Sequence, residues 1–198
     1  MSEIFKVEPE EIKIPERVLA ARLGFKGLGK IPDDFKESFD RAYSIALSVA
    51  KPSAVYETFP SKDTENGVKI GEMIIEGKLA ASQLKGSKGV TVILATLGSK
   101  FDEKIEELHK SGEELLSFFL DGIGSEMAEY FARMLDSALR EKFGQGSARI
   151  SPGYVDLPLS LNGWIIDAIG GQRIGVTYDP QTYIMKPRKT ISAFIGWK

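Results

Sequence analysis

The strongest constraint on the fold is one apolar run, Gly89–Thr96, with the sequence GVTVILAT. The run is rich in β-branched residues and apolar on both faces, which is typical of a strand that is covered on both sides. It therefore predicts the central strand of a sheet. The rest of the chain has to supply neighbouring strands and a layer on each face.

The neighbouring elements follow from periodicity and from helix stop signals. Apolar residues at helical spacing predict five helices, and alternating or continuous apolar runs predict further strands. We expect helices over 16–23, 32–50, 100–111, 113–143 and 159–169, with a short one over 78–84, and strands over 54–59, 68–75, 174–178, 183–185 and 190–195. The first fifteen residues are expected to form an extended lead-in strand or arm.

Helical and extended runs are segregated more than they alternate, which favours the α+β class with a largely antiparallel, twisted sheet flanked by helices. No repeat or low-complexity linker divides the chain. We therefore expect one domain over residues 1–198, in which 1–50 form a mostly helical N-terminal part and 51–198 form an α/β core.

Composition excludes several classes of function. The 198 residues carry a net charge of -2, so no basic field indicates nucleic acid or an anionic membrane. The absence of cysteine and the single histidine, His109, exclude thiolate catalysis and most zinc sites. The N-terminus lacks the apolar region of a signal peptide, and no run is long enough to span a membrane. We expect a cytoplasmic protein with no metal of its own.

Three short features are interpreted as ordinary structure. Gly24–Lys30 has the GxxxxGK spacing of a phosphate loop, but Ile31 follows where a magnesium-binding hydroxyl belongs, so a helix-to-helix connector is expected. His109 lies in a polar helical segment and is expected to be solvated. The cluster of Lys186, Arg188 and Lys189 is expected to be a solvated turn, and the alternative is a docking contact to an acidic partner.

Two carboxylates on the long helix leave an alternative open. Glu126 and Glu129 follow a glycine-interrupted stretch, Gly122–Ser125, and lie near the apolar seam of the helix. One of them can face a pocket and meet a cationic ligand, or both can belong to a solvated face.

The segment Arg149–Tyr154, with the sequence RISPGY, opens the last quarter of the chain. Pro152 restricts itself and Ser151, and Gly153 permits a sharp turn or a close approach of a ligand. Shape alone allows either a small-molecule cradle or a proline-glycine turn beside a solvated Arg149.

This segment resembles the activation domain of cobalamin-dependent methionine synthase, in its free-standing form. The family has an arginine-x-x-Pro-Gly-Tyr element followed by a proline, which here is Pro158. Further matches are Ala128–Glu129–Tyr130 on the long helix and, downstream, 174–177, 183–187 and 190–193. The resemblance covers the C-terminal half well and the N-terminal half only loosely, through residues such as 95–98.

The resemblance implies binding of S-adenosylmethionine. Arg149 would hold the ligand carboxylate, the backbone of Ser151 and Gly153 would bind the adenine or methionine end, and Tyr154 would border the ligand. The family's helix acid matches Ser125 or Glu126, and Glu126 is the expected one. No residue is expected to be catalytic by itself. The family's domain continues past its last strand to a ligand-contacting tyrosine, whereas this chain ends at Trp197–Lys198.

The resemblance also implies partners. No cobalamin-binding motif is present, so cobalamin would arrive only on a methionine synthase core, with a flavodoxin-like protein as electron donor. The function expected is reductive activation in methionine biosynthesis, in complex with that methyltransferase. The alternative is a docking protein, for methionine synthase or another corrinoid methyltransferase, that has lost S-adenosylmethionine binding.

Overall fold

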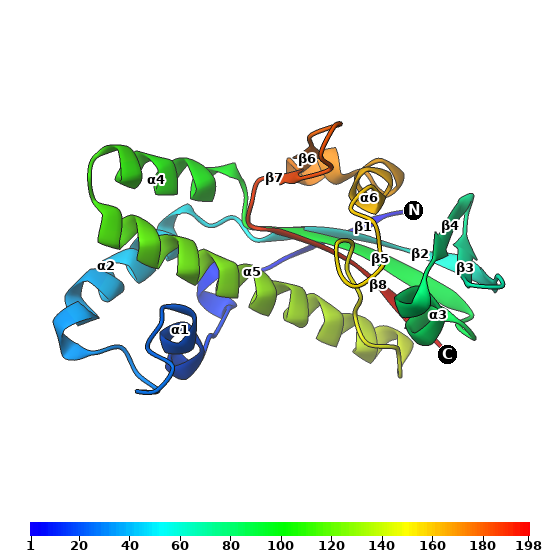
Figure 1. The fold of residues 1–198 in the computed structure, drawn as a ribbon, viewed down its shortest axis with the longest axis horizontal. Coiled ribbons are helices and arrows are strands. Elements are labelled where there is room, and N and C mark those ends of the chain that lie inside the picture. Colours follow the sequence, from blue (N-terminus) through cyan, green and yellow to red (C-terminus); the bar gives the residue numbers. More distant parts are fainter.

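A computed structural model describes residues 1–198, and an antiparallel sheet organises it (Figure 1). The strands run in the order β4-β3-β2-β5-β8, and β1 pairs with β2. Their bounds are β1 Glu3–Lys6, β2 Ser53–Asp63, β3 Gly67–Ile70, β4 Met73–Glu76, β5 Gly89–Thr96 and β8 Thr190–Trp197. The apolar run that predicted a central strand is β5, which pairs along its whole length with β2 and β8.

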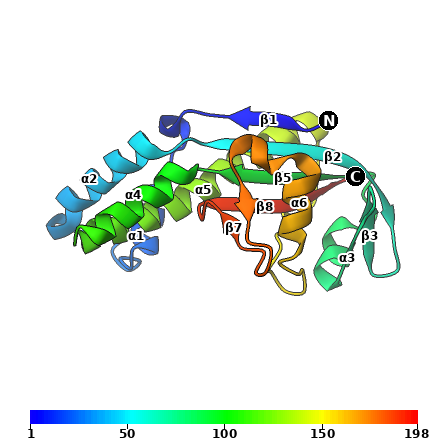
Figure 2. The same ribbon diagram turned by 90° about the horizontal axis from the view of Figure 1, so that it is seen from above.

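Helices lie on both faces of the sheet. The long helix α5 crosses one face, and α6 lies on the other (Figures 1 and 2). The helices are α1 Glu16–Arg22, α2 Asp33–Val49, α3 Lys78–Leu84, α4 Ser99–Lys110, α5 Glu114–Phe143 and α6 Leu161–Ile169, with 3-10 turns η1 Pro9–Glu11 and η2 Gly171–Ile174. The expected α+β class, with an antiparallel sheet and flanking helices, is confirmed.

Each face of the sheet has its own apolar core. Successive side chains of a strand point to opposite faces, so Ile93 and Ala95 of β5 pack with α5, while Val92 and Leu94 pack with α6. The first core also contains the buried residues of α1, α2 and α4, and the second those of α3 and α6. This two-sided burial is the reason that β5 is apolar throughout.

Two glycines let neighbouring helices approach α5 closely. A Cβ added at Gly122 would lie 2.5 Å from Cδ2 of Leu23, which directly follows α1, and one added at Gly124 would lie 2.4 Å from the ring of Phe101 in α4. Neither interrupts the helix, which is continuous over its 30 residues. The glycine-interrupted stretch is therefore a packing device.

Several predicted boundaries were wrong for reasons that lie in the sheet. β2 runs on to Asp63, because its residues 61–63 pair with β3. The expected extended piece 68–75 is a hairpin of β3 and β4, which turns at Gly71 (φ +53°). Two of the three expected closing strands form a separate ribbon, β6 Thr177–Tyr178 with β7 Met185–Lys186, and only β8 joins the sheet.

The N-terminal part is not wholly helical. β1 pairs with β2 over Glu3–Lys6 before α1 and α2 begin, so the expected lead-in strand is part of the sheet. Gly24–Lys30 connects α1 to α2, as expected. No helix combines the length and the apolar character that a membrane span requires.

Candidate functional site

The candidate site lies at the outer edge of β8. The inner edge of this strand pairs with β5, whereas the outer edge pairs only near its end, through bridges of Gly146 with Trp197 and of Ile150 with Phe194. Ile150 and Phe194 exchange both backbone hydrogen bonds, at 3.1 and 2.8 Å. Because backbone direction alternates along a strand, the amides of Thr190 and Ser192 also point outward, where no strand pairs with them.

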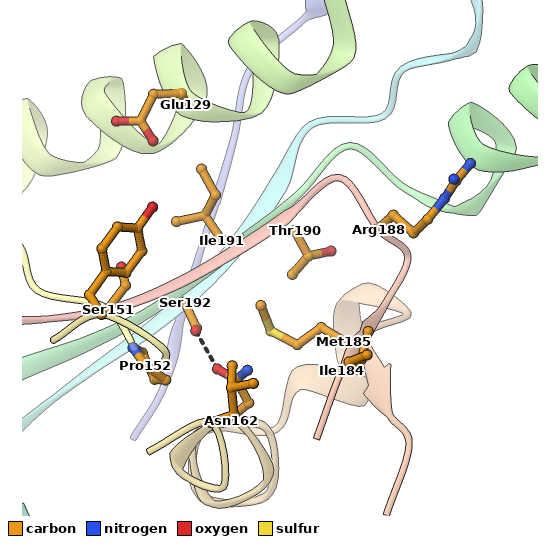
Figure 3. Close-up of a pocket in the computed structure, with 12 residues that line it drawn as sticks. Glu129, Ser151, Pro152, Asn162, Ile184, Met185, Arg188, Thr190, Ile191 and Ser192 are labelled. Carbon is orange, nitrogen blue, oxygen red and sulfur yellow. Dashed lines mark hydrogen bonds between the residues drawn. The ribbon is translucent and has the colours of Figure 1, made fainter. Parts of the chain in front are cut away.

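A cavity of about 380 Å³ opens at this unpaired edge (Figure 3). Its walls come from α5, from residues 151–159, from α6, from residues 184–188 around β7 and from the first half of β8. The lining includes Glu129, Ser151, Pro152, Tyr154, Asn162 and Ser192. A second cavity of about 570 Å³ adjoins it and shares Glu129, Ser151, Tyr154 and Ile191.

The motif Arg149–Tyr154 forms a tight loop beside these cavities. Gly153 has φ +87°, and its N–H donates to the carbonyl of Leu157 at 2.8 Å. That donor is therefore used inside the loop, so the expected ligand contact through Gly153 N–H is not offered by this structure. Pro152 is buried and Tyr154 is 68% exposed, so the loop is anchored at one side and presents its ring to the surface.

A carboxylate ties the loop to α3. The backbone N–H groups of Lys78 and Leu79 donate to the carboxylate of Asp156 at 2.5 and 3.2 Å. These hydrogen bonds hold the pKa of Asp156 below its ordinary value, because they stabilise the charged form. The segment 150–156 is thus fixed at both ends. Ile150 hydrogen-bonds to Phe194 of β8, and Asp156 accepts hydrogen bonds from the first residues of α3.

Arg149 points from the loop toward α5 and forms an ion pair with Glu129. Its side chain is 15% exposed, and its Nη1 atom is buried without a hydrogen-bond partner. Glu129 also accepts from Nε of Arg133 at 3.4 Å. The guanidinium of Arg149 therefore has a spare donor, while its carboxylate partner is shared between two arginines.

The helix carboxylate at the cavities is Glu129, not Glu126. Glu126 is buried under a different arginine, Arg22 of α1, whose Nε and Nη2 both lie 2.6 Å from its Oε1. It lines neither of the two cavities. Helical periodicity left both residues as candidates, and the position of α1 decides between them.

The sequence patterns gave no role, or a wrong one, to other residues at the cleft. Asn162 was placed in a helix without a role, yet its Oδ1 accepts from Oγ of Ser192 at 2.7 Å, which joins α6 to the open strand edge (Figure 3). Lys189 is not solvated: its ammonium is buried and donates to Asp121 and Ser125 at 2.9 Å each. Arg188 lines the first cavity and pairs with Asp102. No short-range pattern reports these long-range contacts.

The remaining charged candidates stay outside the site. His109 is exposed and pairs with Glu114 at 2.8 Å, as expected for a solvated helix residue. No three or more His, Cys, Asp or Glu side chains come together as metal ligands would. The polar groups that line the cleft, among them the Arg149–Glu129 pair, Asn162 and Ser192, can recognise a ligand by charge and hydrogen bonds.

Comparisons with known proteins bear on the fold. No model of a protein family matches the sequence, and no curated protein matches it. Among solved structures, the crystal structure of the MetH reactivation domain bound to AdoHcy matches 100% of this chain and 78% of its own, with a TM-score of 0.71 at 14% identity. This chain has the reactivation-domain fold. The resemblance inferred from the motif is thereby confirmed for the fold, which now includes the N-terminal half.

Proposed function

We propose that this chain binds S-adenosylmethionine in the two adjoining cavities and presents its methyl group to the cobalamin of a separate methionine synthase core. The observation that carries the proposal is the Arg149–Glu129 pair, which lies where the cavities meet in a fold shared with a domain that binds AdoHcy. AdoHcy is the product that S-adenosylmethionine becomes when it loses its methyl group, so the two ligands share every other group.

The amino-acid end of the ligand fits the second cavity. An α-amino acid carries a carboxylate and an ammonium on one carbon, and Arg149 and Glu129 offer one partner for each. Ligand binding would replace the internal pair by two new pairs, so neither charge is left unpaired. The unpartnered Nη1 of Arg149 is buried in this structure, and it would supply the second donor of a forked carboxylate contact once the pair with Glu129 opens.

The nucleoside fits the first cavity. Adenine presents donors and acceptors along one edge, and the outward backbone groups of Thr190 and Ser192 present the complementary set along the open strand. Tyr154, which is shared by both cavities and mostly exposed, can stack against the ring. Ser151 lies between the two ends of the ligand, as both cavities include it.

The chain's own contribution is binding and orientation. Cobalamin, when supplied by the partner, is the methyl acceptor, and a reductant such as a flavodoxin-like protein supplies the electron that it needs. The methyl group leaves sulfur without the bonding electron pair, which stays on sulfur to give AdoHcy. Holding the sulfonium at the exposed mouth of the cleft makes the reaction effectively unimolecular within the complex.

Calorimetric titration of S-adenosylmethionine and AdoHcy tests the binding step. We expect saturable binding of one ligand per chain for both, since both carry the amino-acid and adenine groups. Titrations that stay flat at millimolar ligand would contradict the proposal. They would favour a docking protein that uses the same fold without the ligand.

A further inference from the structure

The second cavity is lined by more positive than negative charge. Two arginines face it, Arg149 from the motif loop and Arg22 from α1. The only carboxylate that lines it is Glu129, which already accepts from Arg149 and Arg133. The ligand contacts proposed above do not use Arg22. A cavity with this surplus of positive charge favours an anionic group.

Arg22 is held in a defined orientation by Glu126. Two of its nitrogens, Nε and Nη2, lie 2.6 Å from Oε1 of Glu126, whose side chain is only 9% exposed. Arg22 has no other hydrogen-bond partner, and its side chain is 51% exposed. One edge of the guanidinium is therefore bound to the buried carboxylate, and the rest remains free to donate.

The contact between α1 and α5 brings this guanidinium to the cavity. Because residue 122 is a glycine, Leu23 packs directly over the α5 backbone, and Cγ of Arg22 lies 3.5 Å from the position of an added Cβ. Glu126 follows one helical turn later. A larger residue at position 122 would push α1 outward and carry Arg22 away from the carboxylate.

Both arginines line the second cavity, and the carboxylates that hold them are close together on α5. Glu126 and Glu129 are three residues apart on α5, so they are neighbours on one helix face. Glu126 thus holds Arg22, and Glu129 holds Arg149, at the lining of the same cavity.

We infer that Arg22 is a second guanidinium contact for the carboxylate of the bound amino-acid end, and that Glu126 is its positioning residue. This inference rests on the proposed function, because it concerns the ligand that the cavities would hold. The carboxylate would lie between Arg22 and Arg149, and Glu129 would be left to the ammonium. A ligand without an amino-acid end would gain nothing from Arg22.

The test compares two ligands on matched variants of the full chain. AdoHcy carries the amino-acid end, and 5′-methylthioadenosine is a related thioether nucleoside that lacks it. We expect Arg22→Met to raise the Kd for AdoHcy about tenfold, the size of one charge-assisted hydrogen bond, and to leave that for 5′-methylthioadenosine unchanged. Arg22→Lys keeps the charge and should recover part of the loss.

Arg17 provides the control, because it lies on the same helix, is exposed and forms no ion pair. Arg17→Met removes the same charge and should change neither Kd. If Arg22 only clamps α1 onto α5, Arg22→Met would lower the melting temperature and raise both Kd values by the same factor, which would overturn the inference. Equal AdoHcy affinity in Arg22→Met and native protein would overturn it too. If native protein binds no AdoHcy, the proposed function itself fails, and the inference fails with it.

Discussion

Glu126 and Glu129 are the same residue type on the same helix, three positions apart, and they are used differently. Glu126 is 7% exposed and belongs to one arginine, Arg22, which holds α1 against α5. Glu129 lies at the meeting point of two cavities and is shared by Arg149 and Arg133. The first pair is part of the packing, and the second can be exchanged for a ligand. The difference arises from what the rest of the chain brings to each carboxylate.

The largest expected effect on ligand binding concerns the Arg149–Glu129 pair, which a ligand can replace. Arg149→Ala should weaken S-adenosylmethionine binding about 100-fold, because the ligand carboxylate loses both donors of a forked contact. Glu129 is about one-third exposed and keeps Arg133, so it is not left as a buried unpaired charge. The melting temperature should therefore fall by only about 2–4 °C. Calorimetric titration and thermal melting measure the two quantities, and a variant that fails to fold would assign Arg149 to the packing instead.

The carboxylate of the same pair should have a smaller effect on binding. Glu129→Gln keeps the size of the side chain and removes the charge that faces the ligand ammonium. We expect the Kd for S-adenosylmethionine to rise about tenfold, as for one hydrogen bond to a charged group. Melting should change little, because the side chain is partly exposed. Unchanged affinity would show that the ammonium finds another partner.

The packing pair, Arg22–Glu126, should lose less affinity than the Arg149–Glu129 pair for a comparable loss of stability. Glu126→Gln removes the charge beneath Arg22, and we expect a loss of about 1 kcal/mol of stability, because Arg22 is half exposed and water screens the pair. The melting temperature should fall by about 2–4 °C. The Kd for S-adenosylmethionine should rise less than in Glu129→Gln, since Glu126 acts on the ligand only through Arg22. A larger loss of affinity than in Glu129→Gln would invert the comparison.

Loss of the Asp156 carboxylate should have the smallest effect, which concerns the melting temperature alone. Since hydrogen bonds to Lys78 and Leu79 lower the pKa of Asp156, its stabilisation is complete above the unfolded pKa, about 3.9, and is lost as pH falls through the lower folded pKa. Native protein should melt slightly higher than Asp156→Asn at pH 6, and the difference should shrink below about pH 4. Melting curves across pH 2–7 check this expectation. A difference that is constant over that range would show that the charge of Asp156 does not stabilise the loop.

Local signals in the sequence predicted the elements well. β5 and α3 have the predicted bounds, Gly89–Thr96 and Lys78–Leu84, because an apolar run and a helical period are each contained within the segment. The hairpin of β3 and β4 and the extension of β2 were missed, since strand pairing depends on partners that are distant in the chain. The motif at 149–154 was located correctly, but its loop uses the Gly153 N–H internally.

The site was predictable only in part for the same reason. The sequence left open whether one helix acid meets a pocket, and it gave no sign that α1 would cover Glu126 and leave Glu129 at the cavities. Asn162 and Ser192 meet across thirty residues of chain, and Lys189 is buried by Asp121 and Ser125 of α5. A list of polar residues cannot show which ones the fold will bring together.

Transfer of a labelled methyl group tests the central claim most directly. S-adenosylmethionine with a labelled methyl would be incubated with an isolated methionine synthase core that contains oxidised cobalamin, a reductant and this chain. We predict that label reaches the cobalamin only when the chain and the reductant are both present, and that Arg149→Ala removes the effect of the chain. Equal labelling with and without the native chain would contradict the account.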